Sequence, residues 1–212
     1  MAATETRLLL LGAVLLFEPV NGYQVRRELM SWGVDDWGHI NPGSIYSGFT
    51  TLTKQGHLER HDLVEKDRPV AVYTSTDPGR AEFERLARVS LETVDPLSPL
   101  PFHTALALVP LLPRQRVKEH LEKRLDHVDR RRAEADSTPF DADAMPPHLP
   151  MLLGFWNRSS DVEREFVVSM LDRISRGELT FAGEPARWTP PRDDPGWQMD
   201  ADRRRYRAAL GL

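Results

Sequence analysis

The stretch NPGSIYSGFTTLTKQGHL, residues 41–58, has the pattern of a short helix with one apolar face. Asn41 can cap the first amide groups, and Pro42 occupies the first helical position, where its missing N–H costs nothing. The apolar positions recur at helical spacing and are Ile45, Phe49 and Leu52. Gly56 favours the end of the helix. The stretch therefore predicts a helix whose inner side packs on a core.

The opposite side of this helix carries small or hydrogen-bonding residues and no carboxylate. Such side chains can donate to phosphates or base edges, whereas carboxylates would repel the phosphates. The DNA contacts expected from this helix and its cap are Asn41, Ser44, Tyr46, Ser47, Thr50, Thr51 and Lys54. A polar helix face is often only a solvated surface, so the neighbouring elements have to distinguish the two interpretations.

Apolar patterns and capping residues predict further elements on both sides of this helix. They are helices at 8–17 and 22–32, strands at 58–64 and 70–76, and a helix after Thr76. Three helices followed by a hairpin is the order of a winged helix-turn-helix, in which one helix enters the major groove of DNA. Lys66 and Arg68 at the hairpin tip are the expected wing contacts, and they alternate with Glu65 and Asp67.

Three segments of this region resemble the PadR family of transcriptional regulators. They read LLLLGAVLLFEPVNGYQVRREL (8–29), NPGSIYSGFTTLTKQGHLE (41–59) and DRPVAVYTSTDPGRAEFE (67–84). Together they follow the family pattern over most of residues 5–85. The resemblance implies a repressor of neighbouring genes that a small hydrophobic or aromatic effector releases from DNA. It also implies a homodimer formed by C-terminal helices.

The charge balance gives no general attraction to nucleic acid. The formal net charge is −4, and residues 1–94 contain 10 Lys and Arg against 13 Asp and Glu, a net charge of −3. We therefore expect few phosphate contacts per subunit. The acidic balance also supports an alternative function, a winged-helix protein-interaction module that has lost DNA binding.

Composition divides the chain into four regions. Residues 1–94 are the expected DNA-binding domain, 95–113 a proline-rich junction, 114–181 a helical dimerisation domain, and 182–212 an irregular or disordered tail. Within the third region we expect a helix over 114–136, a short apolar helix over 148–156, and a last helix that a Ser160-x-x-Glu163 capping box opens. The expected fold is therefore mainly α, with a two-stranded wing.

The helices of the third region have apolar stripes wider than one thin domain needs, which favours a second subunit as their cover. The residues expected at the dimer interface are Val117, Leu121, Leu125, Val128, Phe166, Met170 and Ile174. Phe155 and Trp156 lie on the short apolar helix between the longer ones. They are candidates for an effector site, although packing at the dimer interface is the slightly preferred explanation.

Several function classes find no support. The chain has no cysteine, its histidines show no metal-ligand spacing, and no cluster of catalytic groups or phosphate loop is present, so we expect neither an enzyme nor a metal or other cofactor. The apolar run Leu8–Phe17 is too short to span a bilayer and is expected to be a core helix. We expect a cytoplasmic protein whose partners are double-stranded DNA and a second copy of itself, with no membrane partner.

Overall fold

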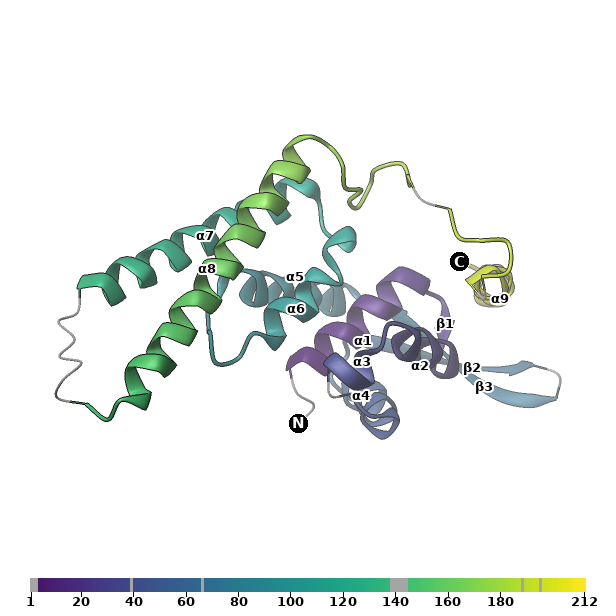
Figure 1. Ribbon diagram of the computed structural model, residues 1–212. Helices are drawn as coiled ribbons and strands as arrows, with labels where there is room; N and C mark the ends of the chain where they lie inside the picture. The colour runs from purple at the N-terminus through teal and green to yellow at the C-terminus, as the bar shows by residue number, and fades with distance from the viewer. Residues whose placement is uncertain (1–3, 39, 66, 138–144, 188, 195) are drawn as a thin grey trace.

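The computed structural model describes residues 4–38, 40–65, 67–137, 145–187, 189–194 and 196–212, and Figure 1 shows its course. The described part of the chain is mainly helical, with one small antiparallel sheet. A winged helix-turn-helix comes first, and a pair of long helices lies beside it at the opposite end from the wing (Figure 1). The expected fold class is thus confirmed.

The winged helix-turn-helix has the predicted helices and hairpin and two additional short elements. Its elements are α1 (Thr4–Phe17), β1 (Val20–Asn21), α2 (Gly22–Ser31), α3 (Val34–Trp37), α4 (Pro42–Lys54), β2 (Leu58–Glu65), β3 (Arg68–Ser75) and α5 (Asp77–Glu92). The strand order is β1-β3-β2, and β2 pairs with β3 from Leu58 opposite Ser75 to Glu65 opposite Arg68. The sequence analysis missed β1 and α3, because two or four residues are too few to show a period.

The remaining elements are α6 (Leu100–Leu106), a 3-10 turn η1 (Val109–Leu111), α7 (Arg114–Ser137), α8 (His148–Ser175) and α9 (Gly196–Leu210). The helix predicted over 114–136 corresponds to α7. The division predicted within α8 was wrong, because residues 148–175 form one helix. Ser160 does not cap a new helix, since its Oγ donates to the carbonyl oxygen of Trp156 one turn earlier, at 3.2 Å.

The prediction of an irregular tail was wrong for residues 196–210, which form α9. This helix lies against α1 and β1 (Figure 1). Its buried residues are Met199 and Tyr206, whose side chains pack against the body of the protein. Docking of a few side chains stabilises a helix whose own sequence is rich in arginine and gives little sign of an apolar face.

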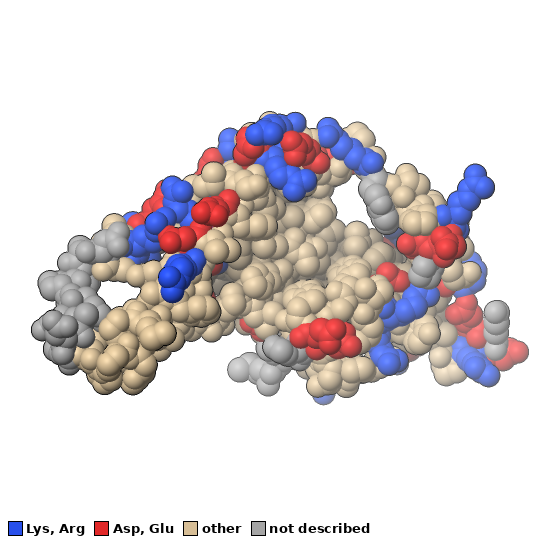
Figure 2. Space-filling model, viewed as in Figure 1, with Lys and Arg blue, Asp and Glu red and all other residues tan. Residues whose placement is uncertain are grey.

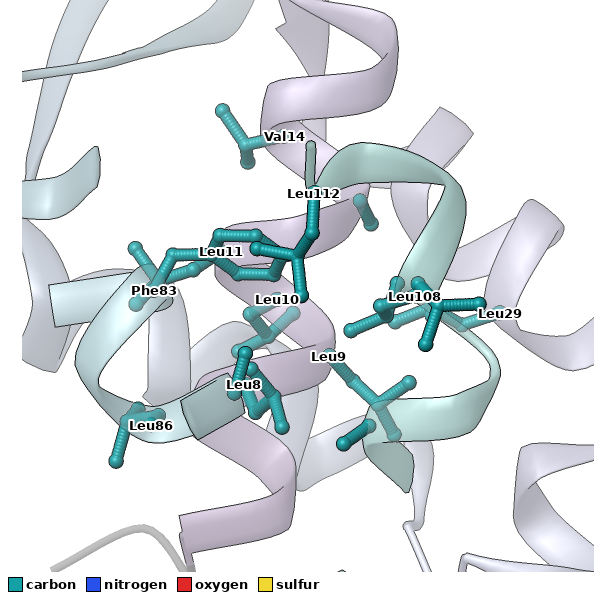
Figure 3. Close-up of a cluster of buried hydrophobic side chains, with 14 of the residues drawn as sticks. Leu8, Leu9, Leu10, Leu11, Val14, Leu29, Phe83, Leu86, Leu108 and Leu112 are labelled. Atoms are coloured by element: carbon teal, nitrogen blue, oxygen red, sulfur yellow. The ribbon is translucent and has the colours of Figure 1, made fainter. Parts of the chain in front are cut away.

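The core is built around α1, whose residues Leu8–Leu11 are fully buried. Figure 3 shows these leucines among Phe83 and Leu86 of α5 and Leu108 and Leu112 from the segment after α6. The interpretation of residues 8–17 as a buried core helix is therefore correct. In the described ranges, no helix is both long and apolar enough to cross a membrane.

The same core includes part of the expected junction. Phe102, Leu108 and Leu112 are buried with residues of α1, and the core continues into α7 through Val117. The expected junction thus contributes apolar side chains to the core. The expected boundaries at residues 94 and 114 remain a prediction.

An ion-pair cluster joins α1 to α5 on the outside of this core. Glu82 accepts from Arg7 at 3.0 Å and from Arg85 at 2.7 Å. The bond from Arg85, together with that from Arg7, lowers the pKa of Glu82 to about 2 against the opposing effect of burial. The carboxylate therefore stays charged well into the acidic range and links the first helix to the helix that follows the wing.

Candidate DNA-binding surface

The local structure of α4 is the one that its sequence predicts. Asn41 is the N-cap, and its side chain accepts from the backbone N–H of Ser44 at 2.9 Å. The predicted inner face, made of Ile45, Phe49 and Leu52, is buried. Phe49 also stacks on Tyr73 of β3, with ring centroids 4.3 Å apart. The helix α4 is thereby fixed to both the helical core and the wing.

Gly48 has a packing role on the same inner face. A glycine in a helix interior costs about 0.5–1 kcal/mol relative to alanine. Here a Cβ atom at position 48 would lie 2.3 Å from Cδ1 of Leu10. The absence of a side chain therefore allows α4 to approach α1 closely.

The predicted outer face of α4 points away from the core. Asn41, Ser47, Thr50 and Lys54 are exposed, and the side chain of Tyr46 is 47% exposed. Ser44 and Thr51 are half-buried at the edges of the same face. All seven residues expected on this helix and its cap therefore reach its surface. Among the described residues, the face carries no carboxylate.

The hydroxyl groups of this face are already engaged within α4. Ser44 and Ser47 donate to the carbonyl oxygens of Asn41 and Ser44 at 2.7 and 3.1 Å. Thr50 and Thr51 donate to those of Tyr46 and Ser47 at 3.1 and 2.9 Å. Each hydroxyl thus presents lone pairs to the outside and must rotate before it can donate to a phosphate.

The wing carries charges of both signs. Arg68 is exposed, Arg60 pairs with Asp62 at 2.7 Å, and Lys66 lies outside the described residues. Figure 2 shows acidic and basic side chains next to each other at the wing and along α7 and α8, without a continuous basic surface on the face in view. The described part of the wing therefore has no excess of cations.

The C-terminal helix contacts the wing near its tip, at the end of β2, which the sequence analysis did not predict. The Tyr206 hydroxyl accepts from Nδ2 of Asn21 at 3.0 Å and donates to Glu65 at 3.4 Å. Arg205 forms an ion pair with the same Glu65. Gln24 of α2 donates to Asp202 at 2.7 Å. These contacts connect α9 to the start of α2 and to the wing, and burial raises the pKa of Tyr206.

Tyr23 is a further surface residue of this region. Its side chain is 61% exposed at the start of α2, whereas Tyr73 is buried. A Cβ atom on the neighbouring Gly22 would lie 3.6 Å from the ring of Tyr46, which places the start of α2 beside α4. The exposure of Tyr23 makes it an additional candidate. The sequence signal for this residue was its position two residues after Asn21, in the first turn of α2.

Most residues expected at a dimer interface are covered by the chain itself. Val117, Leu121, Val128, Met170 and Ile174 are buried, and Leu125 is half-buried. Phe166 is 46% exposed. The stripe on α7 and the end of α8 therefore face each other within one subunit, since these two helices lie side by side (Figure 1). Of the seven, Phe166 is the residue that a partner can reach most directly.

The two effector candidates occupy different positions. A cavity of about 540 Å³ lies between α6 and α8, and its lining includes Phe102, Leu106, Phe155, Val162, Glu163 and Phe166. Phe155 thus belongs to its wall. Trp156 is half-buried and is not among the described residues that line the cavity. No group of histidines and carboxylates within the described ranges could hold a metal ion.

Comparison with known proteins gives one match to a family and several to solved structures. Residues 10–85 match the model of the transcriptional regulator PadR-like family. No curated protein matches the chain significantly.

The similar structures share 18% sequence identity with this chain. They are Bacillus subtilis PadR with operator DNA (76% of this chain and 97% of that one, TM-score 0.31), the PadR-like regulator BC1756 from Bacillus cereus (79% and 94%, TM-score 0.33) and Bacillus subtilis PadR with p-coumaric acid (80% and 97%, TM-score 0.27). These values are too low to place residues of this chain by superposition.

The family match spans α1 through the start of α5, and so includes α4, its cap and the wing. Over residues 10–85, about a third of its length, this chain is similar to the PadR-like family of transcriptional regulators.

Proposed function

We propose that this chain is a dimeric repressor that binds an inverted-repeat operator and is released by a small hydrophobic or aromatic effector. The observation that carries the proposal is the outer face of α4. It is capped, exposed and free of carboxylates, and it lies beside a wing that shares its core. A helix about 10–12 Å wide fits the major groove, and short hydroxyl side chains allow its backbone to come close to the bases.

The proposed mechanism is a shift between two arrangements of the dimer. Two recognition helices have to enter successive major grooves about one helical turn apart, which explains an operator with approximate twofold symmetry. An effector that binds better to a dimer with a different spacing lowers operator occupancy. The cavity between α6 and α8 is a suitable site, because it lies where the winged helix-turn-helix meets the long helices.

We place the proposed dimer interface on the exposed apolar stripe of α8 instead of on α7. Its residues are Met151, Phe155, Val162 and Phe166, which recur on one side of the helix. Figure 2 shows no charged atoms at the end of the molecule where α8 begins, at the lower left of the view. An apolar stripe that its own chain leaves exposed is the kind of surface that a second copy covers.

Replacement of Val162 by glutamate tests this interface. The side chain is 67% exposed, so the folded subunit should tolerate the change. In a dimer it would bury a charge, and we expect the dissociation constant to rise at least about 100-fold. Sedimentation velocity should then report a monomer. Asn157→Glu, at an exposed position on the far side of α8, is the control and should remain dimeric. A dimer of unchanged strength in the Val162 variant would exclude this interface.

A fluorescence anisotropy titration with DNA from the region upstream of the gene tests operator binding. The candidate cations are Lys54, Lys66 and Arg68, three per subunit. Because the slope of log K against log salt is about −0.9 per neutralised phosphate, a dimer should give a slope no steeper than about −5. A slope steeper than about −7 would require contacts beyond those proposed. Absence of binding even at low salt would contradict the repressor function.

The acidic balance of residues 1–94 keeps a second function open, a protein-interaction module on the same fold. Its specific support is the wing, where Glu65 is held by Arg205 and Arg60 by Asp62. Such a module would use the exposed face of α4 without phosphate contacts. Carboxylates introduced on that face separate the two functions, because phosphates repel them and many protein partners do not.

A further inference from the structure

The wall of the cavity between α6 and α8 combines aromatic rings with one carboxylate. Phe102, Phe155 and Phe166 supply the rings, and the rings of Phe102 and Phe166 meet edge to face at 6.3 Å. Glu163 is the one charged residue among the described residues that line it. Apolar surface also comes from Pro96, Pro99, Leu106 and Val162, and polar groups come from His103, Ser159 and Ser160. The dominant features of the wall are therefore negative charge and aromatic faces.

An arginine lies behind this wall and has no accessible surface of its own. Arg124 of α7 is fully buried, and its guanidinium carbon lies 3.5 Å from the centre of the Phe102 ring. Its Nε donates to Oε1 of Glu163 at 2.8 Å, and its Nη2 has no hydrogen-bond partner. Burial lowers the pKa of Arg124, and the bond to Glu163 opposes this effect. A molecule in the cavity meets the Phe102 ring first, because the guanidinium has no accessible surface.

Glu163 itself keeps some accessible surface and one oxygen without a donor. Its side chain is 16% exposed, and among the described residues no donor bonds to Oε2. A carboxylate with a free oxygen beside aromatic faces is the arrangement that binds an ammonium group, through one charge-assisted hydrogen bond and cation–π contacts. An aromatic carboxylate would instead face the repulsion of Glu163. We infer that the effector of this cavity is an organic ammonium compound with an aromatic or apolar body.

The same ion pair gives the cavity a connection to the winged helix-turn-helix. Nη1 of Arg124 donates to the carbonyl oxygens of Leu91 and Thr93, at 3.2 and 2.5 Å, where α5 ends. At its other end, α5 begins directly after the wing strand β3. A ligand that attracts the Glu163 carboxylate thus competes with Arg124 for that carboxylate. The inference rests on the proposed function for its regulatory meaning, but the ligand preference stands on the cavity alone.

Two indole compounds of opposite charge test the preference. Isothermal titration of the DNA-free protein at about pH 8, above the titration range of imidazole, compares tryptamine with indole-3-propionate. We expect tryptamine to bind at least about tenfold more tightly, since one charge is attracted and the other repelled at short range. Equal affinities, tighter binding of the carboxylate, or no binding of either compound would overturn the inference.

Three variants identify the groups responsible. Glu163→Gln can still accept from Arg124, and it should reduce the preference to less than about threefold. Glu165→Gln removes the same charge from an exposed position outside the cavity and should leave the preference unchanged. Phe155→Leu should weaken tryptamine about fivefold and the carboxylate hardly at all. Because Phe155 also lies on the proposed dimer stripe, sedimentation velocity must show the same assembly for this variant and the unaltered chain. A preference that survives Glu163→Gln contradicts the inference.

The outcome for the cavity is separable from the outcome for repression. If tryptamine binds with the expected preference but does not release upstream DNA, the ammonium site stands and effector control fails. If DNA binds as proposed while the indole compounds show no charge preference, the ammonium site fails and the DNA-binding function stands.

Discussion

Replacing both Thr51 and Lys54 with glutamate should weaken DNA binding at least about 100-fold, because the change removes one phosphate partner and places two carboxylates against the backbone. Lys54 is exposed and Thr51 half-buried, on the outer side of α4. The buried side of the helix is unchanged, so the fold should persist. Fluorescence anisotropy with the upstream DNA measures the loss, and circular dichroism checks the helix content.

A second pair of substitutions controls for the overall change in charge. Gln115→Glu with Arg116→Glu alters the net charge by the same amount at two exposed positions near the start of α7. This variant should lose little affinity, since the effect of a charge on DNA falls off within about 10 Å at ordinary salt. An equal loss in both variants would mean that α4 has no special role. No loss in either would favour the protein-interaction module.

The parts of the fold that follow from local chemistry could be predicted from the sequence. Asn41 and Thr76 were expected as N-caps, and each accepts from the backbone N–H three residues on, at 2.9 and 3.1 Å. The hairpin was also expected, since β-branched residues flank a polar turn. Such interactions involve neighbours in the chain, so residue type and spacing are enough to indicate them.

The parts that depend on distant residues could not be predicted in the same way. The strand β1 exists because Val20 and Asn21 pair with β3, and α9 is held by contacts such as Tyr206 to Asn21, 185 residues apart. The capping-box pattern at Ser160 gave a wrong helix start for a related reason. Its Glu163 is used by Arg124 from another helix, so the pattern occurs in the middle of α8.

The same distinction between local and distant interactions applies to the candidate site. The periodicity of α4 predicted which side is exposed, because the spacing of its apolar residues shows which side faces the core. The periodicity of α7 predicted that Val117, Leu121 and Val128 are covered, but it could not identify the cover, which the chain itself provides. A stripe of apolar residues indicates burial without naming the partner.

Gly79→Ala should lower the free energy of unfolding by about 3 kcal/mol, because overpacking against backbone leaves little room to adjust. A Cβ atom at this position, in the first turn of α5, would lie 1.9 Å from the carbonyl oxygen of His57 and 2.8 Å from its carbonyl carbon. For a chain of this size, the corresponding fall in the melting temperature is about 6–12 °C. Differential scanning calorimetry measures it.

Gly56→Ala separates this steric effect from the ordinary cost of losing a glycine. Gly56 has a φ of +73° and no atom within 4 Å of an added Cβ, so we expect a cost of only about 1 kcal/mol from the left-handed conformation. The two glycines lie on either side of one junction, where the Thr76 hydroxyl donates to the carbonyl oxygen of Gly56 at 2.6 Å. This junction holds the end of α4 against the start of α5. Gly79→Ala should therefore also weaken DNA binding at temperatures below the melting temperature of the variant. If the variant were as stable as the unaltered chain and bound DNA with the same affinity, the close contact at His57 would be dispensable.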